Sequence, residues 1–254
     1  VGDFVDIDII DEEKALGHIT KILPRKNTLI RPAVSNVDII AIVQSTASPK
    51  PRPYLMDKYF INVQKYDIDF ILIWTKSDLI DDEAKEYIEV YKSVGIKSFI
   101  ISEKASDINE YDLLIDFLKG KTTALAGVSG VGKSSLINKM CERKRMEVGS
   151  LSKKIERGKH TTRHSEIFCI DKDTYIYDTP GFSSIELSDM DEEDLESYYR
   201  EMAKLSGDCK FNKCSHITEP NCKIKDALNC GKISKMRYDN YTKIYQELKA
   251  KRRH

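Results

Sequence analysis

The sequence has no long apolar run. None of its 254 residues lies in a stretch approaching the roughly 18 consecutive apolar positions that a membrane-spanning helix needs. A secretory signal is also lacking, because the chain opens with Val1-Gly2-Asp3-Phe4. We therefore expect a cytoplasmic protein with no membrane partner.

The chain also lacks net charge, since 41 Lys and Arg residues balance 41 Asp and Glu residues. A neutral average argues against a nucleic-acid partner, but the charges are placed unevenly. Residues 141–164 carry eight basic and three acidic side chains, residues 186–201 carry one basic and eight acidic, and residues 204–254 carry thirteen basic and five acidic. Because charge runs are usually solvated faces, this pattern alone leaves the partner open.

Cysteines are few and clustered. Two of the six, Cys141 and Cys169, are isolated, whereas four lie between residues 209 and 230. In an intracellular chain, clustered cysteines favour a metal site over disulfides.

Hydrophobic patterns predict a few strands in the first thirty residues, then alternating strands and helices, and mainly helices after Ser184. The predicted strands of the alternating part cover residues 39–43, 70–74, 97–101, 122–126, 165–170 and 174–177, and its predicted helices cover residues 54–64, 81–94, 111–118 and 133–140. Such alternation implies an α/β fold with a mainly parallel sheet and ligands at the carboxyl ends of its strands.

A phosphate-binding loop follows the strand at 122–126. The motif G-x-x-x-x-G-K-[ST] is matched by Gly127, Val128, Ser129, Gly130, Val131, Gly132, Lys133 and Ser134, and Ser135 follows. Backbone N–H groups of such a loop cradle phosphates, Lys133 would reach the β- and γ-phosphates, and the Ser134 hydroxyl would bind Mg²⁺. A chance glycine-rich turn is the alternative, and the strand before and helix after the motif disfavour it.

The strand at 70–74 ends in Thr75-Lys76-Ser77-Asp78, which is similar to the [NT]-K-x-D signature of GTPases. The Asp78 carboxylate can accept from two guanine donors, N1–H and the 2-amino group, and adenine would leave it unpaired. Lys76 can lay its aliphatic stem along the base. Thr75 stands where Asn is commoner, so we expect weaker guanine affinity rather than its loss. Ser102, at the end of the next strand, is a candidate for a further base contact.

Two more segments fit nucleotide switches. Asp178-Thr179-Pro180-Gly181 matches D-x-x-G, with Asp178 holding Mg²⁺ through a water and the Gly181 N–H sensing the γ-phosphate. In residues 158–162, Thr162 is the expected Mg²⁺ ligand, with Thr161 able to exchange roles with it. A β-rich loop would be the preferred interpretation of this Thr pair if the other motifs were absent.

The water that attacks the γ-phosphate needs a polar side chain to orient it. The residue that follows the D-x-x-G motif does not supply one here. Phe182 follows Gly181, where small GTPases have a water-orienting Gln. His160 is the best candidate to orient or deprotonate the water, because it lies next to the Thr pair. The alternative is a surface histidine that contacts phosphate or RNA.

The motif order is permuted. The base signature precedes the phosphate loop, whereas ordinary GTPases have the phosphate loop first. As a result, the D-x-x-G segment leads directly into the C-terminal part through the acidic residues 186–201, so hydrolysis could pull on that part.

The C-terminal part carries one metal-ligand pattern, Cys209-x4-Cys214-x-His216-x5-Cys222. Three thiolates and one imidazole suit a closed tetrahedral structural Zn²⁺ site. Cys230 is then spare. The alternative is four unrelated residues of a polar loop. A unit this small, however, needs a stabilising metal or cross-link in addition to its hydrophobic core.

Together these pieces resemble the RsgA family, also called YjeQ or YloQ, of circularly permuted GTPases that depend on the small ribosomal subunit. The resemblance covers nearly the whole chain and rests on residues 29–32, 36–38, 75–78, 127–136, 138, 160–162, 178–182, 209–222, 224, 227, 231, 233, 237–238 and 241. It implies a partial N-terminal OB-fold β-barrel in residues 1–33, a permuted GTPase domain in residues 34–185 and a helical zinc-binding domain in residues 186–254. The N-terminal segment matches only the middle of the OB-fold domain, which puts its rRNA binding in doubt.

The resemblance further implies a Mg²⁺-dependent GTPase that binds GTP and GDP and is expected to be a monomer. Its turnover would be stimulated by the 30S subunit and its 16S rRNA, in late subunit maturation, and the family's proposed catalytic histidine falls on His160. Two rivals remain: a P-loop nucleotide hydrolase that does not act on the ribosome, and an RNA-binding zinc protein with a vestigial nucleotide site.

Overall fold

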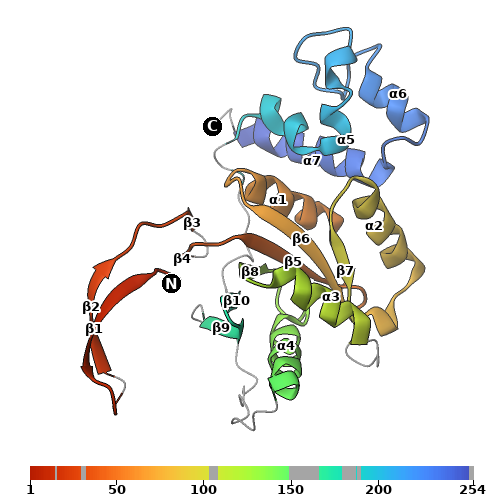
Figure 1. The fold of residues 1–254 in the computed structure, drawn as a ribbon. Coiled ribbons are helices and arrows are strands. Elements are labelled where there is room, and N and C mark those ends of the chain that lie inside the picture. The colour runs from red at the N-terminus through yellow and green to blue at the C-terminus, as the bar shows by residue number, and fades with distance from the viewer. Residues whose placement is uncertain are drawn as a thin grey trace.

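A computed structural model describes residues 1–14, 16–29, 33–102, 108–148, 166–178, 187 and 190–251. A six-stranded sheet stands at the centre of these residues, in the order β7-β6-β5-β8-β10-β9 (Figure 1). Its strands are β5 (Ile39–Ser45), β6 (Asp69–Thr75), β7 (Ser98–Ile100), β8 (Thr122–Ala126), β9 (Glu166–Asp171) and β10 (Thr174–Asp178). All neighbouring pairs are parallel except β9 with β10, which confirms the predicted mainly parallel sheet.

Helices cover both faces of this sheet. They are α1 (Pro53–Gln64), α2 (Asp82–Ser93), α3 (Ile108–Leu118) and α4 (Lys133–Val148), and the 3-10 turn η1 (Ser77–Leu79) follows β6. The strand β5 is buried throughout, and alternate residues point to opposite faces. Ile40 and Ile42 join the core formed with α1 and α2, whereas Ile39 and Ala41 join the core formed with α3 and α4.

The predicted elements agree with those observed to within a few residues, and β8 has the predicted bounds. The largest difference is α4, which was expected to end at residue 140 and continues to Val148. No glycine or proline occurs between Met140 and Val148, so nothing in the sequence stops the helix there.

The N-terminal residues form a hairpin beside the sheet. The strands β1 (Val5–Asp11) and β2 (Leu16–Ile22) pair antiparallel, and the short strands β3 (Thr28–Leu29) and β4 (Val34–Ser35) form a second pair. Within the described residues these are two separate two-stranded sheets, so the strands of the expected partial barrel are present without a closed barrel. The hairpin projects from the molecule, and both of its strands are largely exposed (Figure 1).

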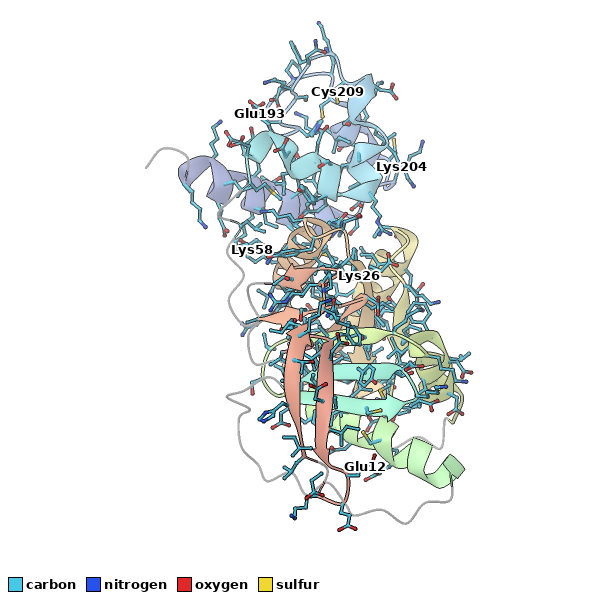
Figure 2. All side chains as sticks on the ribbon, turned by 60° about the vertical axis from the view of Figure 1, so that its left-hand side comes forward. Glu12, Lys26, Lys58, Glu193, Lys204 and Cys209 are labelled. Atoms are coloured by element: carbon cyan, nitrogen blue, oxygen red, sulfur yellow. The ribbon has the colours of Figure 1, made fainter. Side chains whose placement is uncertain are left out.

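The C-terminal unit, residues 190–251, is helical as predicted. Its elements are η2 (Glu192–Tyr198), α5 (Arg200–Ala203), η3 (Ser206–Asp208), α6 (Lys223–Asn229) and α7 (Lys235–Lys251). Figure 2 shows Cys209 of this unit at the opposite end of the molecule from Glu12 of the hairpin.

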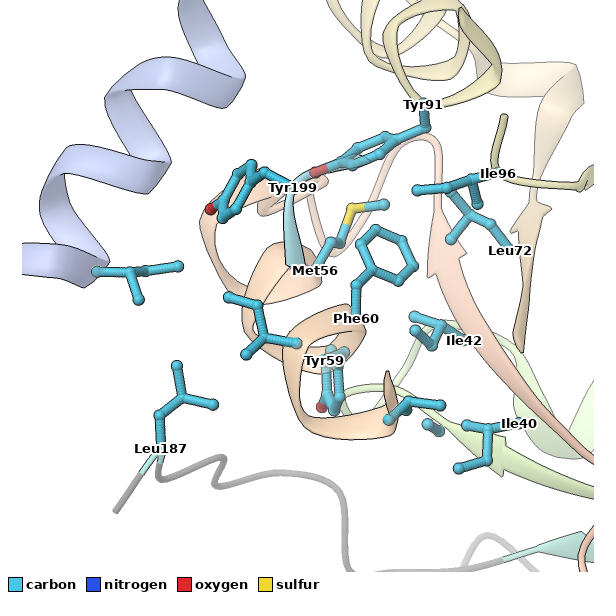
Figure 3. Close-up of a cluster of buried hydrophobic side chains, with 14 of the residues drawn as sticks. Ile40, Ile42, Met56, Tyr59, Phe60, Leu72, Tyr91, Ile96, Leu187 and Tyr199 are labelled. Carbon is cyan, nitrogen blue, oxygen red and sulfur yellow. The ribbon is translucent and has the colours of Figure 1, made fainter. Parts of the chain in front are cut away.

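The C-terminal unit shares a core with the sheet. Figure 3 shows Tyr199 packed beside Met56 and Tyr91, with Phe60 and Leu72 extending the same cluster toward the sheet. Tyr241 and Leu248 of α7 belong to this cluster too. The core is therefore continuous from β6 through α1 to α7.

No helix among the described residues is both long and apolar enough to cross a membrane.

We expect Ile42→Ala to lower the free energy of unfolding by about 2–5 kcal/mol, because Ile42 is 1% exposed in the central strand and its truncation leaves a cavity. The matched control is Ile19→Ala in the hairpin, where the residue is 66% exposed and the change should stay within about 0.5 kcal/mol. Denaturant titration followed by the fluorescence of Trp74, the single tryptophan, measures both. Equal losses in the two variants would contradict the assigned core.

Candidate functional site

The base signature and the phosphate loop lie at one edge of the sheet. The base signature begins at the last residue of β6 and the phosphate loop follows β8, and both strands run parallel to β5 between them. Parallel strands present their carboxyl ends at the same edge, which is where α/β sheets bind ligands. The topology thus brings together two segments that are about 50 residues apart in the sequence.

Hydrogen bonds join these two segments directly. The Thr75 hydroxyl, in a residue 3% exposed, donates to the Val131 carbonyl at 2.5 Å. The Lys76 ammonium donates to the Gly130 carbonyl at 2.9 Å, and Lys76 itself adopts a left-handed backbone with φ of 58°. The hydroxyl has one hydrogen, and its distance to the Gln44 carbonyl is longer, at 3.4 Å, so Thr75 uses its only side-chain donor to join the base signature to the phosphate loop.

The base signature is also supported by the strand beyond it. The Ser77 N–H donates to the Ile101 carbonyl at 3.2 Å, and the Ser102 hydroxyl lies 3.5 Å from Asp78 Oδ1. Ser102 therefore stands beside the carboxylate predicted to recognise the base.

Glycines shape the phosphate loop at two positions. A side chain at Gly127 would place its Cβ 2.4 Å from the Val43 carbonyl oxygen, and Gly127 has φ of +143°. Gly132 has φ of 97° just before α4 begins at Lys133. The loop backbone therefore needs glycine at Gly127 for close approach and at Gly132 for the turn into the helix.

Lys133 folds back over the loop. Its ammonium donates to the Gly127 carbonyl at 2.7 Å and to the Val128 carbonyl at 3.0 Å. Burial lowers the pKa of Lys133, and the nearby Asp178 carboxylate raises it in part. An anion bound in the loop would supply the charge partner that this buried ammonium needs.

The structure brings together two of the predicted Mg²⁺ ligands. The Ser134 hydroxyl lies 3.4 Å from Asp178 Oδ2, although the residues are 44 positions apart. Asp178 ends β10, is 2% exposed and points to the same sheet edge. A hydroxyl and a carboxylate are hard oxygen donors of the kind that Mg²⁺ prefers, so this pair fits the ion.

Three predicted site residues, His160, Thr162 and Gly181, lie outside the described residues. Ser129 and Ser135 lie in the phosphate loop and in the first turn of α4.

The four predicted zinc ligands converge in the C-terminal unit. The donor atoms of Cys209, Cys214, His216 and Cys222 all lie within 4.8 Å of one another. The Cys209 sulfur is 3.9 Å from the Cys222 sulfur, and His216 Nδ1 is 3.6 Å from the Cys209 sulfur and 3.3 Å from the Cys222 sulfur.

These distances fit a single tetrahedral Zn²⁺. With Zn–S bonds of about 2.3 Å, two sulfurs at the tetrahedral angle lie about 3.8 Å apart, and a sulfur and an imidazole nitrogen lie about 3.5 Å apart. Cys230 is exposed and outside the cluster, as predicted.

Burial raises the pKa of the Cys214 thiol to about 12, and burial likewise raises the pKa of Cys222. Without a cation these thiols therefore remain protonated at neutral pH. A coordinating zinc would displace their protons, so zinc affinity should weaken as the pH falls.

Three supports of the metal loop were missed at the sequence level. Glu196 Oε2 forms a short hydrogen bond with Nε2 of the buried His216, which fixes the ring with Nδ1 toward the thiols. The Tyr238 hydroxyl donates to the His216 carbonyl at 2.7 Å, and the Tyr241 hydroxyl donates to the Ser215 carbonyl at 3.1 Å. Glu196 lies in an acidic run whose composition does not indicate which side chains have partners. Its neighbour Glu193 also contacts the metal loop, by pairing with Lys213 at 2.8 Å.

A fourth support is Glu219, whose carboxylate accepts hydrogen bonds from the N–H and hydroxyl of Ser215, both at 2.9 Å. Although burial raises the pKa of Glu219, the hydrogen bonds from Ser215 and the backbone outweigh it and lower the pKa to about 2. Glu219 is therefore an ionised carboxylate whose hydrogen bonds to Ser215 hold the segment between His216 and Cys222 in place.

Comparison with known proteins gives consistent matches. The family model of the RsgA GTPase matches residues 22–188. The small ribosomal subunit biogenesis GTPase RsgA of Agathobacter rectalis is 45% identical over 255 residues, covering 100% of this chain and 84% of that protein.

Solved structures agree with these matches. The crystal structure of YjeQ from Thermotoga maritima is 32% identical with a TM-score of 0.75, covering 98% of this chain and 84% of that one. The crystal structure of YloQ, a circularly permuted GTPase, is also 32% identical, with a TM-score of 0.74, covering 98% of this chain and 80% of that one.

We expect Cys214→Ser to reduce bound zinc well below the about one ion per chain of the unaltered protein, because a hydroxyl is a poor zinc ligand in this set. Loss of the structural zinc should lower the melting temperature by at least about 5 °C. Cys230→Ser is the matched control and should change neither value, since Cys230 is exposed and outside the cluster. Zinc content by elemental analysis and melting by calorimetry test this, and normal values for Cys214→Ser would refute the site.

Proposed function

The chain belongs to the RsgA GTPase family, and from this premise we propose that its GTPase activity serves the biogenesis of the small ribosomal subunit. The observation that carries the proposal is the junction of the base signature with the phosphate loop, made by Thr75 with Val131 and by Lys76 with Gly130. A binding site for a guanine base and its phosphates needs these two segments side by side.

Within this proposal the phosphate loop holds the nucleotide. Its backbone N–H groups and Lys133 bind the phosphates, and Lys133 exchanges its two loop carbonyls for phosphate oxygens. The hydroxyl of Ser134 binds Mg²⁺, with Asp178 acting through a water and Thr162 completing the set. The Gly181 N–H contacts the γ-phosphate.

The guanine base is recognised by the Asp78 carboxylate, with Lys76 along the base plane and Ser102 beside the carboxylate. The Thr75 hydroxyl is committed to Val131, so base recognition rests on Asp78 more than in a GTPase with Asn at this position. Guanine affinity is correspondingly weaker.

Hydrolysis requires a group that orients the attacking water, and we assign this role to His160. An imidazole next to the Mg²⁺-binding threonine can hold the water and accept its proton as the bond to the γ-phosphorus forms. Phe182 has no hydrogen-bonding group for this task.

We further propose that the chain comprises three domains, residues 1–33, 34–185 and 186–254, with one structural Zn²⁺ in the last. The Cys₃His cluster and its geometry support the zinc assignment. The partner is the 30S subunit with its 16S rRNA, in the cytoplasm, bound by a monomer. The subunit stimulates turnover by completing the site around His160, and contacts of Lys and Arg with phosphates make the binding sensitive to salt.

We expect GTP to displace a fluorescent GDP analogue at a concentration at least about 100-fold lower than ATP, because adenine lacks the N1–H and 2-amino donors from which the Asp78 carboxylate would accept. Asp78→Ala should reduce that ratio to within about 10-fold. Asp116→Ala is the control, since this exposed residue of α3 pairs with Lys119, which directly follows the helix. Equal displacement of the analogue from the unaltered protein by ATP and GTP would sink the assignment of guanine specificity.

We expect His160→Ala to lower GTP turnover with 30S subunits by about 100-fold while GDP binding is kept, because a general base contributes on that scale. His164→Ala is the matched control and should retain turnover. If only His164→Ala lost activity, the catalytic role would move to His164, and unaltered protein whose turnover did not rise with 30S subunits would contradict the proposed partner.

A further inference from the structure

A buried carboxylate–guanidinium network joins the sheet unit to the C-terminal unit. Asp57 of α1 is 0% exposed and Arg237 of α7 is 3% exposed. The Arg237 guanidinium forms a short ion pair with Asp57 through Nη1, and its Nε donates to Glu201 of α5 at 2.8 Å. The guanidinium also lies over the Tyr199 ring, 4.3 Å from its centroid.

The Asp57 carboxylate also has hydrogen-bond partners on α7 and α2. Asn240 Nδ2 donates to Asp57 Oδ2 at 2.7 Å, and the Tyr91 hydroxyl lies 3.0 Å from Asp57 Oδ1. Side chains of α2 and α7 therefore bind the Asp57 carboxylate of α1 directly, and α5 joins the network through Glu201 and Arg237. Such fully satisfied buried networks fix the relative position of the elements that supply them.

Side chains of α7 form hydrogen bonds to two separate parts of the molecule, α1 and the metal loop. Arg237 and Asn240 bind Asp57, whereas Tyr238 and Tyr241 bind the carbonyls of His216 and Ser215 in the metal loop. A displacement of α7 would thus disturb the metal loop and α1 together.

The N-terminal end of α1, about one turn before Asp57, is connected to the candidate nucleotide site. Residues 46–52 connect β5 to α1, and the Thr46 hydroxyl donates to the Lys76 carbonyl at 2.7 Å. The Lys76 ammonium in turn donates to the Ser48 carbonyl, in a short hydrogen bond. The Tyr91 hydroxyl, which contacts Asp57, also lies 3.1 Å from the Pro53 carbonyl at the first residue of α1.

These contacts form a continuous chain from the base signature through α1 to the zinc loop. We propose that Asp57 and Arg237 are positioning residues that couple the two sites, so that guanine nucleotide bound beside Lys76 and zinc held at His216 each strengthen the binding of the other. This coupling rests on the proposed function for its two ligands, and by linkage it is the same in both directions.

The first test uses the unaltered full chain loaded with zinc. Zinc release to a colour-forming chelator is timed with and without saturating GDP, and we expect GDP to slow it by about 5-fold or more. Conversely, removal of zinc should weaken GDP binding, measured with a fluorescent analogue. A chain that binds both ligands without either effect overturns the coupling and leaves the proposed function intact, whereas a chain that binds no GDP or no zinc overturns both.

The second test removes the charges of Asp57 and Arg237 together, because removal of one alone would leave the other uncompensated. Glu201 then loses Arg237, but its side chain is 10% exposed and so retains access to water. In the double variant Asp57→Asn and Arg237→Met, GDP and zinc should still bind, but GDP should no longer slow zinc release. Lys235→Met is the matched control, since this exposed lysine of α7 pairs with Asp239 on its own helix, and it should keep the full effect.

Retained coupling in the double variant, or its loss in the Lys235→Met control, would overturn the assignment to Asp57 and Arg237. Should the double variant not fold, the two reciprocal measurements on the unaltered chain still decide whether the sites are coupled.

Discussion

The parallel pairing of β5 with both β6 and β8 is the constraint on which the nucleotide site depends. This pairing places the ends of β6 and β8 on one edge, whichever of the two comes first in the chain. A circular permutation moves the chain ends without altering strand neighbours, so the base signature can precede the phosphate loop and still meet it. The bonds from Thr75 and Lys76 to the loop carbonyls then fix the distance between the base signature and the phosphate loop.

Local patterns were sufficient to predict the sheet, its covering helices and the convergence of the Cys₃His cluster. The alternation of apolar strands and amphipathic helices is a short-range property, and β8 was predicted to the residue. The cluster was predictable because all four candidate ligands lie within fourteen residues, and in the structure their donor atoms lie close enough to hold one ion. The four strands of the N-terminal segment were harder to predict, because a period-two pattern does not say which strands pair or whether they close into a barrel.

The contacts that were missed are those between residues far apart in the sequence. Asp57 and Arg237 are 180 positions apart. Arg237 is among the residues that carry the family resemblance, but nothing in the sequence indicates that Asp57 is its partner. The acidic run 186–201 illustrates the same limit, because its composition is typical of a solvated connector. In the structure, Glu196 orients His216 and Glu201 binds Arg237, so part of this charge is structural. The net neutrality of the chain thus includes acidic groups with specific partners inside the C-terminal unit.

The buried network also bears on how hydrolysis could act on the C-terminal unit. In the permuted chain the D-x-x-G segment leads into this unit, so a pull through the sequence connection is the simplest expectation. Separation of the unit from α1, however, would leave Asp57 without Arg237, at a cost of about 3–5 kcal/mol. Coupling free energies between sites are typically about 1–3 kcal/mol, which is too little to break the pair. Any displacement on hydrolysis should therefore carry α1 along with α7, and with α1 the residues that contact the base signature.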